Sequence, residues 1–113
     1  MKKVKAKGTQ GNWLVDVNGE KLPTAHMEFL YGMRYRRTSD AMVKKTGKYK
    51  SWVDALLEKK KVILTLDQWT GEPGAAGSKA KRIGYVGVYA VDDIVVVGNS
   101  HSFRLLELMA ECT

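Results

Sequence analysis

The chain has 113 residues, of which 44% are hydrophobic and 27% charged, and these proportions are typical of one globular domain. No apolar run approaches the roughly 20 residues needed to cross a bilayer, and no apolar segment follows the basic start, so we expect a cytoplasmic protein without membrane contact. The net charge of +7 is local: residues 1–50 carry 12 Lys and Arg against 4 Asp and Glu, whereas residues 51–113 carry 7 against 8.

The N-terminal part of the chain is predicted to form β-structure. Residues 2–7 alternate weakly and predict a short edge strand, whose lysines discourage strand-to-strand aggregation. Apolar and polar residues alternate clearly over residues 13–17, and Asn18-Gly19 follows directly. That dipeptide is typical of the type I′ turn of a β-hairpin, so a strand is predicted on each side of it.

The next part of the chain has mixed signals. Residues 25–33 place apolar side chains at helical spacing behind Thr24, a residue that can cap a helix, and predict a short helix. Residues 33–38 alternate like a strand. Ser39-Asp40 is then placed to open a further helical turn, which Gly47 would end.

A helix is predicted to start at Ser51, because the apolar side chains after it lie on one side and the lysines of residues 59–61 suit the negative end of the helix dipole. Residues 62–66 are rich in β-branched side chains and predict a buried strand that continues towards Trp69. Residues 70–82 contain glycines and a proline but no bulky apolar side chain, so we expect an exposed, flexible loop.

The C-terminal part is predicted as two strands and a helix. Residues 83–91 and 94–97 predict strands joined by a tight turn at Asp92-Asp93. Turns favour aspartate, and this explains the two adjacent carboxylates without a functional role. Asn99 or Ser100 is placed to cap a final helix that packs onto the sheet.

Together these elements predict one α+β domain over residues 1–113, with the loop at 70–82 inside it. We expect a strongly curved or partly closed mixed sheet of five or six strands, covered by two or three helices. This make-up resembles small barrels of the PUA-like kind in general architecture only.

The strongest functional signal is a basic and aromatic segment. Arginine and lysine bind phosphates, and tyrosine stacks on an unpaired base, so their interleaving favours a nucleic-acid surface, although a solvated face with tyrosines in the core has the same composition. The predicted nucleic-acid-binding residues are Arg34, Tyr35, Arg36, Arg37, Lys44, Lys45, Lys48, Tyr49, Trp69, Lys79, Lys81 and Arg82, and Tyr31 belongs to the same segment.

Neither a cofactor nor a metal is predicted. The segment GAAGSK does not have the GxxxxGK[ST] spacing of a phosphate-binding loop. Cys112 is the only cysteine, so no internal disulfide and no zinc site of cysteines can form. His26 and His101 are the candidates for a general base, if the fold places either beside a carboxylate.

Three functions follow from these observations. The first is a small nucleic-acid-binding module without catalytic activity, for DNA or RNA. The second is a protein-binding module or inhibitor that targets an acidic or nucleic-acid-binding surface of another protein, because a positive field attracts either partner. The third is a small enzyme that uses His26 or His101.

Overall fold

The computed structural model describes residues 3–7, 13–38, 47–73, 75, 77–98 and 100–112, which form a mostly β structure. One mixed sheet has the strand order β2-β3-β4-β7-β8-β9-β6-β5, and β1 pairs with β9 beside this path. The elements are β1 (Lys3–Val4), β2 (Ala6–Lys7), β3 (Leu14–Val17), β4 (Glu20–His26), the 3₁₀ turn η1 (Met27–Phe29), β5 (Leu30–Tyr31), β6 (Arg34–Thr38), α2 (Gly47–Lys59), β7 (Lys61–Trp69), β8 (Ala80–Val97) and β9 (Ser100–Cys112).

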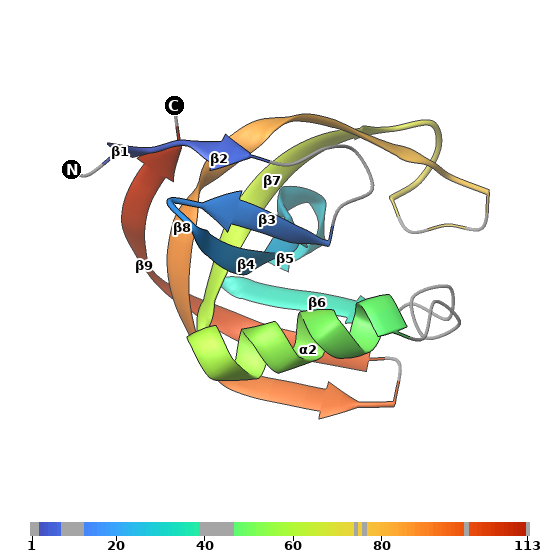
Figure 1. Cartoon of the computed structure of the whole chain (residues 1–113). Helices are drawn as coiled ribbons and strands as arrows, with labels where there is room; N and C mark the ends of the chain where they lie inside the picture. The colour runs from blue at the N-terminus through green and yellow to red at the C-terminus, as the bar shows by residue number, and fades with distance from the viewer. Residues whose placement is uncertain are drawn as a thin grey trace.

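The sheet is strongly curved, as predicted, but it is not closed into a barrel. Figure 1 shows β8 and β9 bending along their length, and α2 packs against β4. Within the described ranges, no helix has the length and apolar character that a membrane span requires.

The hairpin of β3 and β4 confirms the predicted turn. Asn18 and Gly19 have φ values of 53° and 86°, the left-handed conformation that a type I′ turn requires at both positions. Val17 pairs with Glu20 across the turn, and Asp16 Oδ1 accepts a hydrogen bond of 2.9 Å from the Gly19 backbone N–H. The predicted edge strand at the N-terminus is present as β1 and β2.

The buried strand predicted from the β-branched run is β7. Its residues 62–65 are all buried, because β7 pairs in parallel with β4 on one side and antiparallel with β8 on the other. Val62 and Leu64 belong to a core cluster on the inner face, which α2 covers, whereas Ile63 belongs to a second cluster on the opposite face. Thr65 and Asp67 follow Ile63 at the same alternating positions of the strand, and both are buried.

Helix α2 closes the inner core through Tyr49, Trp52 and Leu56. The indole Nε1 of Trp52 donates a hydrogen bond of 2.9 Å to the backbone carbonyl of Thr24. A buried indole N–H needs such a partner, so this bond fixes the helix against β4 as well as the packing does.

The predicted number of two or three helices is not confirmed, because the described residues contain one α-helix. It begins at Gly47, earlier than the predicted Ser51. Residues 25–33 form the end of β4, the turn η1 and β5 instead of a helix. The helical turn predicted from Ser39-Asp40 falls on residues outside the described ranges.

The predicted C-terminal helix is wrong, because residues 100–112 form the strand β9. His101, Phe103 and Leu105 are buried at a period of two. The pairing with β8 then shifts register, and the inward positions resume at Leu108 and Ala110. Leu105 and Leu108, on either side of this shift, are three positions apart, and that spacing resembles the spacing of apolar residues in a helix.

The predicted hairpin at Asp92-Asp93 is also wrong, since β8 runs without a break from Ala80 to Val97. Asp93 has φ of 50°, and the register with β9 shifts between Asp92 and Val95. The two aspartates therefore mark a bulge within one long strand, where aspartate tolerates the left-handed conformation.

Two glycines of β8 give a matched test of this packing. A Cβ at Gly87 would lie 2.6 Å from Leu108 Cδ1 and 2.8 Å from the Ala110 carbonyl oxygen, whereas a Cβ at Gly84 would meet nothing within 4 Å. We expect Gly87→Ala to lower the free energy of unfolding by about 1–3 kcal/mol, measured by urea denaturation. Gly84→Ala is the control, and equal effects of the two substitutions would contradict the close approach of β9 to Gly87.

Candidate functional site

An exposed surface lies on the outer face of β5, β6, β9 and the C-terminal part of β8. Strand pairing aligns its residues in cross-strand rows, since Arg36 pairs with Ser102 and Ser102 with Val95. We call this surface the arginine face, and it consists of Tyr31, Arg34, Arg36, Thr38, Val95, Val97, Ser100, Ser102 and Arg104.

Three of the predicted residues meet at a groove on the arginine face. The groove has a volume of about 360 Å³ and is lined by Arg34, Arg36, Arg37, Thr38, Val95, Val97, Ser100, His101 and Ser102. The alternation of β6 and β9 directs the side chains of Arg37 and His101 to the inner face. The groove itself therefore offers arginine and hydroxyl groups beside two exposed valines.

Two of the three arginines on this face are held by aspartates of the bulge in β8. Arg34 Nη1 lies 2.8 Å from Asp93 Oδ2, and Arg104 binds Asp92 through two hydrogen bonds of 2.9 and 2.6 Å. The hydrogen bond and charge of Arg104 lower the pKa of Asp92. Arg36 is exposed and has no acidic partner among the described residues. Its guanidinium group is therefore available to bind an anion.

The structure separates the predicted tyrosines from the predicted cations. Tyr35 is only 1% exposed and stacks on Phe103 at a centroid distance of 4.7 Å, while Tyr49 is a buried residue of α2 itself. Neither ring is accessible to a nucleobase in this conformation. Tyr31 is 67% exposed and pairs with Arg34 between β5 and β6, so it is the accessible aromatic ring of the arginine face.

A second groove gathers three predicted residues where β7 ends and β8 begins. Its volume is about 330 Å³, and its lining is Gln68, Trp69, Thr70, Lys79, Ala80 and Lys81. Lys79 and Lys81 are exposed, whereas Trp69 is half-buried and its Nε1 donates a hydrogen bond of 2.8 Å to Glu28 Oε1. That bond limits how freely the indole can reorient towards a ligand.

The remaining predicted residues lie elsewhere. Lys48 is exposed on α2, which covers the inner face of the sheet. Arg82 is largely buried, with its Nε 3.8 Å from Asp67 Oδ1. Lys44 and Lys45 fall outside the described residues.

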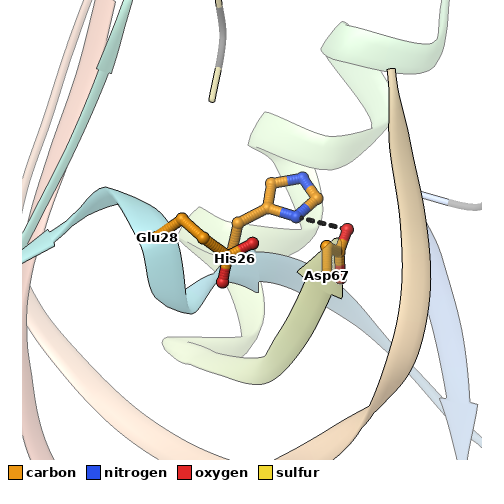
Figure 2. A group of neighbouring side chains, drawn as sticks. All are labelled: His26, Glu28 and Asp67. Carbon is orange, nitrogen blue, oxygen red and sulfur yellow. Dashed lines mark ion pairs between the residues drawn. The ribbon is translucent and has the colours of Figure 1, made fainter. Parts of the chain in front are cut away.

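A polar cluster at the end of β4 and in the second half of β7 brings His26 to a carboxylate. Nδ1 of His26 lies 2.9 Å from Asp67 Oδ2 and 3.4 Å from Thr65 Oγ1. Figure 2 shows Glu28 from η1, His26 from the end of β4 and Asp67 from β7 converging. One donor atom from each of these three residues lies within 4.8 Å of the others. We call these three residues the His26 cluster.

Electrostatics keep the carboxylate of this cluster ionised. Burial alone acts to raise the pKa of Asp67, but the hydrogen bond and charge of His26, together with the charge of Arg82, hold it below its usual value. A histidine fixed by a buried carboxylate has the arrangement of a general base and its orienting partner. The same donor set is also chemically suited to a metal ion.

The sequence identified His26 but neither of its carboxylate partners. Asp67 lies four positions after Ile63 and two after Thr65, so its burial could have been inferred from the alternation of β7. Its distance from His26 depends on the parallel pairing of β4 with β7, where His26 pairs with Thr65. No local signal predicts that pairing.

His101, the other candidate base, is a core residue. Its ring centroid lies 4.6 Å from that of Trp52 and 5.9 Å from that of Tyr35, and its Nδ1 is 3.3 Å from the Tyr49 hydroxyl. Burial, with a smaller effect from the charge of Arg37, lowers the pKa of His101 to about 4. The imidazole is therefore neutral at pH 7.

Comparison of the chain with protein-family models, with curated proteins and with solved structures found no match. Its function is therefore inferred from its own residues.

The buried His101 predicts a stability that depends on pH. The unfolded chain binds a proton at this side chain near pH 6.5, but the folded chain binds it only near pH 4. Stability is therefore fully present above about pH 6.5 and is lost as the pH falls towards the folded-state pKa, by about 3 kcal/mol in total.

Urea denaturation at pH 7.5, 6, 5 and 4.5 measures this loss. The variant His101→Phe keeps an aromatic ring in the core and should lose most of the pH dependence between 6.5 and 4.5. A variant whose stability falls with pH as steeply as that of the wild type would show that His101 is not responsible.

Proposed function

We propose that this chain binds single-stranded nucleic acid on the arginine face, without catalytic activity. The groove lined by Arg34 and Arg36 is the observation that carries the proposal, because it combines arginine with hydroxyl donors on an exposed sheet face. Arginine binds phosphate through two parallel hydrogen bonds, and serine or threonine adds single ones.

Within this proposal each residue has a defined part. Arg36 binds a phosphate, because no acidic side chain of the described residues competes for it. Arg34 is oriented by Asp93 and by a hydrogen bond of 3.4 Å to Ser102 Oγ, and it borders the same groove. Tyr31 stacks on an unpaired base, which favours a single strand over a duplex.

Lys79 and Lys81 extend the proposed surface as secondary phosphate contacts. Both are exposed and border the groove that Trp69 lines. We also retain, as part of the proposal, the general likeness to small PUA-like barrels, which the curvature of the open sheet supports.

A second candidate function is protein binding through the same face. Val95 and Val97 are 45% and 69% exposed beside the arginines. Exposed apolar side chains rimmed by charged residues favour a protein contact more than a phosphate contact. A stoichiometric protein complex that survives nuclease treatment would favour this function over the first.

The nucleic-acid proposal predicts a defined salt dependence. We expect Arg36→Ala to weaken binding to a labelled single-stranded oligonucleotide and to reduce the slope of log K against log salt by about 0.7, since one phosphate contact is lost. Tyr31→Ala should weaken binding by about 1–3 kcal/mol with an unchanged slope. Fluorescence anisotropy over a salt series, with DNA and RNA of the same sequence, measures both effects.

Lys21→Ala is the matched control, because Lys21 is exposed on β4, away from the arginine face. Its removal should leave affinity nearly unchanged. Equal losses in Lys21→Ala and Arg36→Ala would indicate a non-specific attraction to the net charge. Undetectable binding to every oligonucleotide would refute the proposal.

A further inference from the structure

The His26 cluster comes from β4, η1 and β7, whereas the arginine face comes from β5, β6, β8 and β9. We propose that His26, Glu28 and Asp67 bind one divalent transition-metal ion of the Zn²⁺ or Mn²⁺ class. This proposal does not depend on nucleic-acid binding, because none of the three residues belongs to the arginine face.

The donor set suits such an ion. One imidazole nitrogen and two carboxylate groups are ligands that Zn²⁺ accepts, and Mn²⁺ favours carboxylate oxygen. Two ligands bound to one ion at about 2.1 Å lie about 3.0–3.4 Å apart. His26 Nδ1 and Asp67 Oδ2 are separated by 2.9 Å, and the Glu28 donor lies within 4.8 Å of both. A small movement of Glu28 would complete a three-ligand site.

Two buried carboxylate oxygens without hydrogen-bond partners independently favour a cation-binding site. The Asp67 side chain is only 3% exposed, and its Oδ1 accepts no hydrogen bond. Oε2 of Glu28 is likewise buried without a hydrogen-bond partner. Buried carboxylate oxygens are costly unless they are hydrogen-bonded or bind a metal, so two of them on residues that converge indicate a bound ligand of positive charge.

The groups around the cluster match those that orient metal ligands. Trp69 Nε1 donates to Glu28 Oε1 at 2.8 Å, which fixes that carboxylate while Oε2 remains available. Thr65 Oγ1 lies 3.4 Å from the His26 ring nitrogen and 3.5 Å from the Ala25 carbonyl oxygen. Hydrogen bonds of this kind hold ligands in the orientation that binding requires.

The charge of Arg82 does not prevent binding. Its Nε lies 3.8 Å from Asp67 Oδ1, beyond hydrogen-bond distance, and its guanidinium carbon lies 5.6 Å from the centre of the Tyr85 ring. The charges of the Glu28 and Asp67 carboxylates and of Arg82 sum to −1. A divalent ion changes the local charge to +1, whereas the cluster without an ion leaves a negative charge largely buried.

Calorimetric titration of the untagged chain with ZnCl₂ and MnCl₂ tests the proposal. A Cys112→Ser background excludes zinc binding by the partly buried thiol. We expect one ion per chain, with Zn²⁺ bound more tightly than Mn²⁺ and Mg²⁺ bound weakly. Glu28→Gln and Asp67→Asn should each weaken Zn²⁺ binding at least tenfold.

Matched controls come from exposed carboxylates of the same types. Asp54, which pairs with Lys50, and Glu72 are exposed and do not belong to the His26 cluster, so Asp54→Asn and Glu72→Gln should bind Zn²⁺ like the parent chain. Circular dichroism confirms that each variant is folded. If Asp67→Asn does not fold, Glu28→Gln decides, because Glu28 lies in a short turn and is partly exposed.

A second readout uses Trp69, whose ring centroid lies 5.6 Å from that of His26. Co²⁺ bound at the cluster should quench tryptophan fluorescence in the parent chain and quench it much less in Glu28→Gln. No Zn²⁺ binding to the parent chain, or binding unchanged in both Glu28→Gln and Asp67→Asn, would overturn the proposal.

Discussion

The burial of β7 on both faces is the constraint on which the rest of the structure depends. Parallel pairing with β4 and antiparallel pairing with β8 leave no exposed edge along its first half. Alternate side chains of β7 therefore enter two separate cores, Val62 and Leu64 on the side of α2 and Ile63 on the other. The same alternation carries Asp67 into the interior, where an ionised group requires partners.

The position of His26 follows from that constraint. Thr24, Ala25 and His26 pair with residues 63–65, which sets the end of β4 beside the second half of β7. Trp52 binds the Thr24 carbonyl oxygen from the helix side, so the inner face is closed over this region. A polar cluster thus forms at the border of the core, where side chains are held firmly but remain close to solvent.

The sequence predicted the features that depend on neighbouring residues. Asn18-Gly19 determined its turn locally, and the β-branched run after Lys61 needed only its own composition to indicate a strand. The segment of β9 was mistaken for a helix because its apolar positions step by three where the pairing with β8 shifts. That shift is a property of two strands together, and one strand alone does not contain it.

The candidate functional residues were likewise predicted only where they are close together in the sequence. Arg34, Arg36 and Arg37 were recognised as a group because they are close together in the sequence, and they do border one groove. Tyr35 shares their segment but points to the opposite face, a consequence of strand alternation that the interleaved composition concealed. Glu28 and Asp67 are far apart in the sequence, so only the tertiary pairing of strands shows that they are neighbours.

The parallel pairing of β1 with β9 brings the two ends of the described chain together. Lys3 is aligned with Glu111 and Val4 with Cys112. A short linker could therefore join the termini, and the chain could be opened instead between β7 and β8, where residues 71–73, 75 and 77 are exposed. Such a circular permutation would keep every strand pair while moving the chain ends beside Trp69 and the second groove.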